Sequence, residues 1–366
     1  MSKNILVYGA GAIGRGYVPW LFKNTDTKLY FVETNKNLHS ELIKDKKFTT
    51  YMTTKSGYES YECSIEECFF PGEEFSYSYD GVITAVGPRQ IINIKDNLKK
   101  LKCPIIFFEN DHTLPDKISR LTKSENFFFG IPDVITSNTA PEHLRKKSKL
   151  SIVTENGVAY AHISAKDVGG NINYVNSEQL NKQWLAKLYI HNTPHCIAAY
   201  LGSLCNFTFL HEGMNCDDIY NIVKDAMFEM VLSTEIVYKI ERDFLEWYSN
   251  KELNRFSNKL LFDPISRVAR EPFRKLGLTN RLVGAAQLCL RAGIKPKNII
   301  TGIMAAFLYD DINDNDSNIK ILIESLKPVD FLKLIINIQP NEALYELIIS
   351  NWGENMEILK GIKNGR

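Results

Sequence analysis

The distribution of apolar and polar residues divides the chain into a first half of short apolar runs and a second half with helical periodicity. Four runs in the first half are bounded by Gly, Pro or polar residues, as buried parallel strands are, and they lie at residues 4–8, 28–32, 81–86 and 104–108. Residues 14–23 suit a helix. Strands that alternate with helical stretches predict βαβ units in a doubly wound sheet.

Two further segments of the first half have strand character. Residues 50–79 are rich in Tyr, Thr, Ser and Glu, and we expect them to form strands or hairpins inserted in the same sheet. Residues 150–175 predict further strands at the end of the first domain.

From about residue 180 the periodicity becomes helical, and it predicts helices at residues 217–247, 279–292, 297–308, 318–326 and 341–350. Gly293 is expected as a C-cap and Asp316 with Ser317 as an N-cap, while residues 310–316 are expected as a solvated loop. The fold class is therefore α/β plus all-α. We expect a Rossmann-type domain with inserted strands over residues 1–185 and an all-helical substrate domain over residues 186–366.

Composition and charge agree with a two-domain protein of the cell interior. A chain of 366 residues exceeds the usual size of one core. With 44 basic and 43 acidic residues the net charge is +1, so we expect no nucleic-acid or membrane partner. We expect no secretory signal, because glycines follow the first apolar run within nine residues, and no membrane span, because no run of roughly 18 apolar residues is present. Seven scattered cysteines without a CxxC spacing favour a reduced, cytoplasmic protein.

A glycine-rich turn follows the first predicted strand and precedes a helix. It matches GxGxxG and consists of Gly9, Ala10, Gly11, Ala12, Ile13 and Gly14. The first glycine of such a motif makes a tight turn, the second lets the backbone approach a pyrophosphate, and the third lets helix and strand pack closely. The motif therefore predicts a dinucleotide site, although a glycine turn without a ligand is the alternative.

Residues at the ends of later strands are expected to complete the cofactor site. Glu33 ends the second strand, nineteen residues after Gly14. Its carboxylate can accept hydrogen bonds from the adenosine ribose and would repel a 2′-phosphate, which favours NAD over NADP. Thr84, Val86 and Gly87 lie at the carboxyl edge of the sheet, where they either contact the cofactor or form a plain turn.

The segment 187–196 (KLYIHNTPHC) concentrates residues with catalytic potential. On an ideal helix Lys187, His191, His195 and Asn192 lie at roughly 0°, 40°, 80° and 140°, so they could line one wall. Pro194 lacks a backbone donor, and we expect it in the first turn of a new helix capped by Thr193.

Several motifs in order resemble the polyol-specific long-chain dehydrogenases, the mannitol dehydrogenase family. They are GAGxIGRG at 9–16, TAVGP at 84–88, the pair Glu109-Asn110, KLxxxNTxHxIxAYLG at 187–202 and a basic segment near 270. The resemblance implies an NAD-dependent oxidation of a polyol without a metal, in a protein that is often monomeric. It implies that Asn110 contacts the cofactor and that the catalytic residues are Lys187 as general base, Asn192 as donor to the reacting oxygen and His195 as holder of substrate hydroxyls.

Elementary chemistry agrees with those roles. A lysine must be partly neutral to act as a base, and burial or nearby cations lower its pKa. A fixed amide donor stabilises charge that develops only in the transition state.

The sequence also departs from the family pattern. Relatives usually carry glycine at the position of Pro194. Some have a second asparagine upstream, for which residues 127–136 offer only the acidic Asp133.

Metal binding is the alternative reading of this segment, since His191 and His195 stand four apart with Cys196 and His211 nearby. No HExxH is present and Pro194 disturbs the helix, so we expect no metal and treat His191 as a wall residue.

A local excess of positive charge lies at residues 267–281, where five cations face Glu271 alone: Arg267, Arg270, Arg274, Lys275 and Arg281. Arginine forks bind phosphate in a bidentate manner. The segment resembles that of family members that act on polyol phosphates, which implies that Arg267 and Lys275 face the substrate while Arg270 and Arg274 supply phosphate charge. A solvated helix face is the alternative.

We therefore expect a polyol phosphate as the small-molecule partner. A free polyol, a sugar acid, or a dinucleotide-binding protein without turnover are the other readings.

Overall fold

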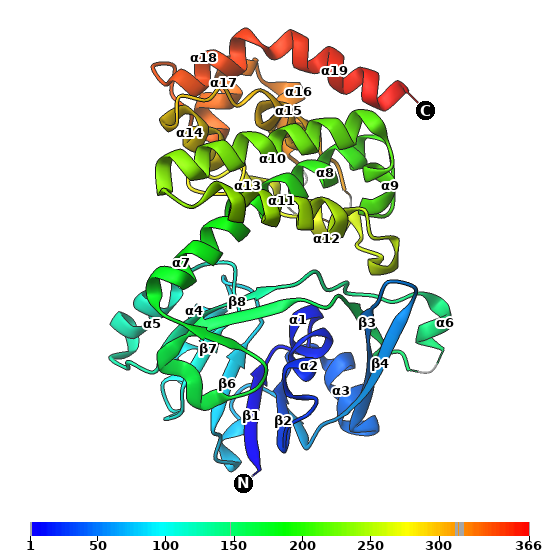
Figure 1. Ribbon diagram of the computed structural model, residues 1–366, viewed down its shortest axis with the longest axis vertical. Helices are drawn as coiled ribbons and strands as arrows, with labels where there is room; N and C mark the ends of the chain where they lie inside the picture. The colour runs from blue at the N-terminus through cyan, green and yellow to red at the C-terminus, as the bar shows by residue number, and fades with distance from the viewer. Residues whose placement is uncertain (1, 147, 312–313, 315–317, 366) are drawn as a thin grey trace. The chain divides into compact units, whose positions relative to one another are not determined.

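The structure is a computed structural model that describes residues 2–146, 148–311, 314 and 318–365. The chain forms two compact units (Figure 1). The first consists of Met1–Trp184 with Leu260–Phe262, and the second of Leu185–Lys259 with Asp263–Arg366. The short segment 260–262 is fixed to the first unit by hydrogen bonds, from the Tyr58 hydroxyl to the carbonyl of Leu260 (2.8 Å) and from the Ser137 hydroxyl to that of Phe262 (2.9 Å).

The first unit contains an eight-stranded sheet in the order β11-β10-β8-β7-β6-β1-β2-β5. Its strands are β1 (Lys3–Tyr8), β2 (Thr27–Val32), β5 (Glu67–Phe69), β6 (Gly81–Thr84), β7 (Ile105–Phe107), β8 (Phe127–Asp133), β10 (Val158–His162) and β11 (Asn173–Val175). The strands from β5 to β8 are parallel, and β10 runs antiparallel to β8. The expected doubly wound sheet is confirmed, and the strand order reverses beside β1, where such sheets bind ligands.

Helices cover both faces of this sheet, which explains the uninterrupted apolar runs in the sequence. Val7 and Phe31 point into one core, together with side chains of α2 (Val18–Phe22) and α3 (Lys36–Asp45). Their neighbours Leu6 and Tyr30 point into the other core, together with α4 (Ile91–Leu98) and α5 (Leu114–Thr122). Successive side chains of a strand alternate between faces, so both sets must be apolar.

The expectation that residues 50–79 insert in the main sheet is wrong for most of that segment. Strands β3 (Lys47–Thr53) and β4 (Tyr58–Ser64) form an antiparallel hairpin that joins β9 (Ile152–Thr154) in a separate three-stranded sheet. Only β5 enters the main sheet. Most residues of β4 are exposed or half-buried, so that strand could not lie inside a sheet that helices cover on both faces.

The second unit is helical. Helix α7 (Ser177–Ala186), which belongs to the first unit up to Trp184, a π-helical turn η3 (Lys187–Asn192) and α8 (Thr193–Leu204) follow one another without a break. Every residue of α8 from Thr193 to Gly202 is buried. The remaining helices are α9 (Leu210–Met214), α10 (Asp217–Tyr238), α11 (Arg242–Phe256), α12 (Ile265–Ala269), α13 (Pro272–Lys275), α14 (Val283–Arg291), α15 (Lys297–Phe307), α16 (Ile319–Ser325), α17 (Pro328–Phe331), α18 (Ala343–Ser350) and α19 (Trp352–Asn364).

The helix expected over residues 217–247 is two helices. Lys239 adopts the left-handed conformation (φ 57°) and ends α10 with a hydrogen bond from its N–H to the carbonyl of Glu235. Apolar residues continue beyond this turn, so the periodicity did not show it. The C-cap predicted at Gly293 is confirmed by its φ of +74° after α14. The N-cap predicted at Asp316 and Ser317 lies outside the described residues. In the described part of the chain, no helix is long and apolar enough for a membrane crossing.

The glycines of the first turn provide a matched test of the fold. A Cβ added at Gly14 would collide with the carbonyl oxygen of Gly9, whereas one at Gly11 would meet nothing within 4 Å. We expect Gly14→Ala to lower the free energy of unfolding by on the order of 3 kcal/mol, or to prevent folding. Gly11→Ala should leave it within about 0.5 kcal/mol of the wild type. Urea unfolding followed by circular dichroism measures both, and equal stability of the two variants would contradict this packing.

Candidate active site

The glycine turn after β1 is held against the neighbouring strand ends. Gly9 has φ +92°, and its N–H donates to the carbonyl of Val32 over 2.8 Å. A Cβ at Gly9 would come within 2.6 Å of the carbonyl oxygen of Ala85. Two of the three motif glycines are therefore required by packing, and Gly11 is the one that leaves space open beside the turn. That open space is what a close approach of a pyrophosphate requires.

Glu33 braces the same turn from the end of β2. One of its carboxylate oxygens accepts from the N–H of Ala10 (2.9 Å), and the other accepts from the N–H groups of Thr34 and Asn35 (2.8 Å each). A carboxylate offers about four acceptor positions, so capacity remains for a ribose hydroxyl. Glu33 thus fixes the backbone of the predicted nucleotide site, in addition to any direct contact that it makes with the cofactor.

Glu109, which follows β7, has a role that its place in the sequence did not indicate. Its buried carboxylate accepts from the Thr84 hydroxyl (3.0 Å) and from the N–H groups of Val86 and Gly87 (2.9 Å each). It therefore fixes the strand-end segment predicted to contact the cofactor, while Asn110 beside it is exposed. Burial raises the pKa of Glu109 from 4.5 to about 7, although its three hydrogen bonds act in the opposite direction.

The π-helical turn η3 carries the predicted catalytic amine and amide at its two ends. In a π-helix residues five apart are bonded and share a face, and Lys187 and Asn192 are its first and last residues. Both are buried. Among the described residues, the side-chain nitrogen Nδ2 of Asn192 has no hydrogen-bond partner. A buried N–H donor without a partner costs about 1–3 kcal/mol, and it fits a ligand oxygen.

The expectation that Thr193 caps a new helix is wrong. The helix continues through the π turn, and the Thr193 hydroxyl donates to the carbonyls of Arg281 (2.7 Å) and Leu188 (3.3 Å). Pro194 lies in the first turn of α8. Proline disrupts a regular helix because it lacks an N–H and crowds the carbonyl four residues earlier, and a π-helical bulge is one way to accommodate such a residue.

His195, in the first turns of α8, is tied to Asp263. The Nε2 of His195 lies 2.9 Å from a carboxylate oxygen of Asp263, whose other oxygen accepts from Arg267. A carboxylate can only accept, so Nε2 carries the proton and Nδ1 is the acceptor. Burial lowers the pKa of His195 despite the opposing effect of Asp263, which keeps the ring neutral. Burial would raise the pKa of Asp263, but Arg267 and His195 outweigh it and hold that pKa below its ordinary value.

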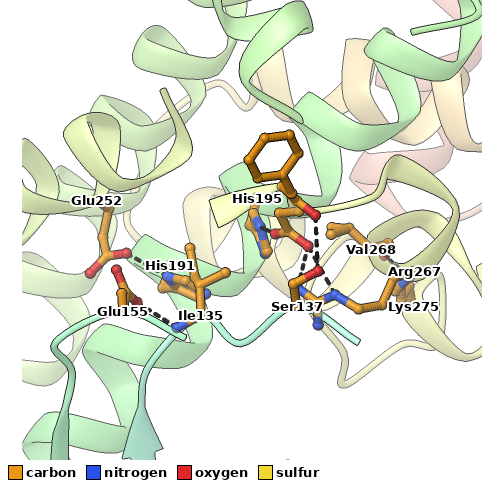
Figure 2. A network of polar contacts seen from close by, with 11 residues as sticks. Ile135, Ser137, Glu155, His191, His195, Glu252, Arg267, Val268 and Lys275 are labelled. Atoms are coloured by element: carbon orange, nitrogen blue, oxygen red, sulfur yellow. Dashed lines mark hydrogen bonds and ion pairs between the residues drawn. The ribbon is translucent and has the colours of Figure 1, made fainter. Parts of the chain in front are cut away.

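His191 has a different partner. Its Nδ1 lies 2.5 Å from a carboxylate oxygen of the fully buried Glu252 (Figure 2). Glu252 also pairs with Arg255. The rings of His191 and His195 lie 4.9 Å apart. The Cys196 thiol donates to the carbonyl of Thr193, and burial raises its pKa. In the second unit the two imidazoles are thus held by separate carboxylates.

Most of the predicted substrate-binding cations already contact protein groups. Arg267 pairs with Asp263, and Arg274 pairs with Glu271 at 2.8 Å. The ammonium of the buried Lys275 donates to the carbonyl of Val268 (Figure 2). It also donates to the carbonyl of Arg270. The side chain of Arg270 is exposed.

The fold and this buried polar set define a two-domain oxidoreductase. Residues 180–333 match the family model described as the mannitol dehydrogenase C-terminal domain. The chain is 27% identical to a mannitol-1-phosphate 5-dehydrogenase of Thermoanaerobacter pseudethanolicus, over 96% of this chain and 98% of that protein. It is 29% identical to one of Caldanaerobacter subterraneus, over 83% and 86%.

Two solved structures share the fold over 99% of the chain. A mannitol 2-dehydrogenase of Pseudomonas fluorescens, in ternary complex with NAD and D-mannitol, has a TM-score of 0.76 at 15% identity and is covered over 94% of its length. A D-sorbitol dehydrogenase in substrate-free form has a TM-score of 0.67 at 13% identity, with 96% covered. The resemblance to the polyol-specific long-chain dehydrogenases is confirmed.

The raised pKa of Glu109 predicts a specific pH dependence of stability. The folded chain keeps this carboxyl protonated up to about pH 7, whereas the unfolded chain ionises it near pH 4.5. The stabilising contribution is therefore complete below pH 4.5 and is lost as the pH rises to about 7, by at most about 3 kcal/mol.

We expect the wild type to lose more stability than Glu109→Gln between pH 5 and pH 7.5. Urea unfolding at both values measures the difference, with the exposed Glu357→Gln as control. Identical pH dependence of the wild type and Glu109→Gln would contradict the assigned pKa.

Proposed function

We propose that the protein reversibly oxidises D-mannitol 1-phosphate to D-fructose 6-phosphate with NAD and without a metal. The observation that carries the proposal is the buried π-helical turn that presents an amine at Lys187 and an unpartnered amide at Asn192. The two named relatives, which match 96% and 83% of the chain, support the same substrate.

Lys187 is the general base of the proposed reaction. Its uncharged amine takes the proton of a secondary hydroxyl, while the hydrogen on the same carbon leaves as hydride. NAD, when bound, supplies the hydride acceptor. A lysine performs this role only where its surroundings disfavour the charged form, and Lys187 is buried.

Asn192 donates to the oxygen that changes from hydroxyl to carbonyl. The partial negative charge on that oxygen is largest in the transition state, so a fixed N–H donor stabilises the transition state more than the substrate. Because Nδ2 is already buried without a partner, its desolvation cost is met during folding and does not recur in each turnover.

His195 positions the polyol. With its proton on Nε2, held by Asp263, its Nδ1 can accept from a neighbouring substrate hydroxyl. The low pKa of His195 keeps this acceptor available below neutral pH. Asp263 acts through His195 and is a positioning residue.

The cofactor and the phosphate are assigned to the two remaining groups of predicted residues. Residues 9–14 with Glu33, Thr84, Val86, Gly87 and Asn110 are proposed to bind NAD, and the open side of Gly11 fits a pyrophosphate. The Glu33 carboxylate would repel the extra phosphate of NADP. We propose that Arg267 and Lys275 face the substrate and that Arg270 and Arg274 add phosphate charge.

Removal of the base tests the mechanism. We expect Lys187→Ala to lower kcat by on the order of 10³-fold or more, because no other group takes the hydroxyl proton. NAD binding, measured by isothermal titration calorimetry, should be unchanged. Lys224→Ala, on the exposed face of α10, is the matched control. A kcat of Lys187→Ala equal to that of the control would refute the assigned base.

The substrate and cofactor are tested by initial rates of NADH formation. We expect kcat/KM for mannitol 1-phosphate to exceed that for mannitol, sorbitol and sugar acids, and the rate with NADP to be far below that with NAD. Gly11→Ala should fold but lose NAD affinity, because its methyl group occupies the open space. Equal or higher kcat/KM for a free polyol would replace the proposed substrate with that polyol.

A further inference from the structure

Arg281 is a buried cation without a buried anion. It lies between α13 and α14 and is 8% exposed. Within the described part of the chain no carboxylate forms an ion pair with it. Its one side-chain hydrogen bond runs from Nε to the amide oxygen of Asn280 (3.3 Å). Buried charges in proteins are nearly always paired, so this guanidinium indicates a missing partner.

The backbone of Arg281 is fixed beside the predicted catalytic turn. Its carbonyl accepts from the hydroxyl of Thr193 over 2.7 Å, and Thr193 directly follows Asn192. The next residue, Leu282, donates its N–H to the carbonyl of Lys275 over 3.2 Å. These bonds hold the residue in place from two elements of the same unit.

A second unpartnered polar group lies in the same region. The hydroxyl of Tyr200, on α8, is completely buried and has no hydrogen-bond partner among the described residues. The ammonium of Lys275 lies 5.6 Å from the centre of the Tyr200 ring.

The surrounding charge is an excess of cations. Burial, and after it the charge of Arg281, hold the pKa of Lys275 well below its usual value. Burial lowers the pKa of Arg281 itself to about 10. Arg274 adds a further cation, and its partner Glu271 is the one acidic residue of the segment 267–281.

We propose that Arg281 and the Tyr200 hydroxyl form the inner anion site that binds the phosphate group of the substrate and sets the preference for phosphorylated over free polyols. The identity of this anion rests on the proposed function. The two terminal nitrogens of Arg281 would bond two phosphate oxygens, the Tyr200 hydroxyl a third, and the ammonium of Lys275 adds positive charge. A free polyol would leave the guanidinium and the hydroxyl unpaired. A site whose buried polar groups are left without partners binds the analogue that lacks the phosphate more weakly.

The proposal predicts opposite effects on stability and on binding. Arg281→Met keeps an unbranched apolar chain in place of the aliphatic part of the arginine and removes an unpaired buried charge. Without phosphate, its unfolding temperature should therefore equal or exceed that of the wild type. Inorganic phosphate should raise the unfolding temperature of the wild type and not that of the variant. A merely structural arginine would give the reverse, a lower temperature and an unchanged response.

Kinetics test the specificity. We expect Arg281→Met to lower the ratio of kcat/KM for mannitol 1-phosphate to that for mannitol by on the order of 100-fold, and Tyr200→Phe by on the order of 10-fold. The KM for NAD should not change. Arg291→Met, an exposed arginine on α14, is the matched control and should keep both the ratio and the phosphate response.

The outcomes separate this inference from the proposed function. If the wild type prefers mannitol 1-phosphate and Arg281→Met keeps that preference, the inner anion site is wrong and the function stands. If the wild type shows no preference, the proposed substrate is wrong. If phosphate then stabilises the wild type but not Arg281→Met, an anion site at Arg281 is still supported. If phosphate stabilises both proteins equally, the anion site is overturned as well.

Discussion

The π-helical turn between α7 and α8 is the constraint on which the rest of the helical unit depends. It allows one helix to pass from Ala186 to Thr193 without a break although Pro194 cannot complete a regular helical ladder. The extra residue per turn brings the amine of Lys187 and the amide of Asn192 to one face. Had the chain restarted as a new helix at Thr193, Asn192 would lie in the connecting segment and not on the helix that carries Lys187.

Buried carboxylates hold several of the groups assigned to function. Glu33 and Glu109 accept backbone N–H groups at the edge of the sheet, while Glu252 and Asp263 hold the two imidazoles. Each carboxylate fixes the orientation of the group that donates to it. Removal of the carboxylate would therefore leave that group without a fixed orientation. Arg281 is the complementary case, a buried cation for which the described chain supplies no anion.

The features that could be predicted from the sequence are those encoded locally. The glycine turn and the strands that alternate with helices depend on residues close together in the chain, and the periodic pattern displays them. The break at Lys239 could not be seen, because a lysine in the left-handed conformation leaves no compositional mark. The separate position of β3 and β4 depends on the exposure of one strand, which composition alone did not reveal.

The candidate site divides in the same way. Lys187, Asn192 and His195 are recognisable as a motif. Glu109 and Asp263, in contrast, are distant in sequence from the groups they hold. Glu109 is 25 residues from Thr84, and Asp263 is 68 residues from His195. Nothing local distinguishes them from other acidic residues. The spacing from Asp263 to Arg267, one helical turn, was the available signal for that pair.

The membership of segment 260–262 in the first unit has a consequence for connectivity. The backbone passes between the two units after Trp184, after Lys259 and again after Phe262. Cleavage after Trp184 releases Met1–Trp184 but leaves residues 260–262 of the first unit on the other fragment. The gene therefore cannot be divided at residue 185 into two self-sufficient pieces, because the first piece would lack the tripeptide that Tyr58 and Ser137 hold.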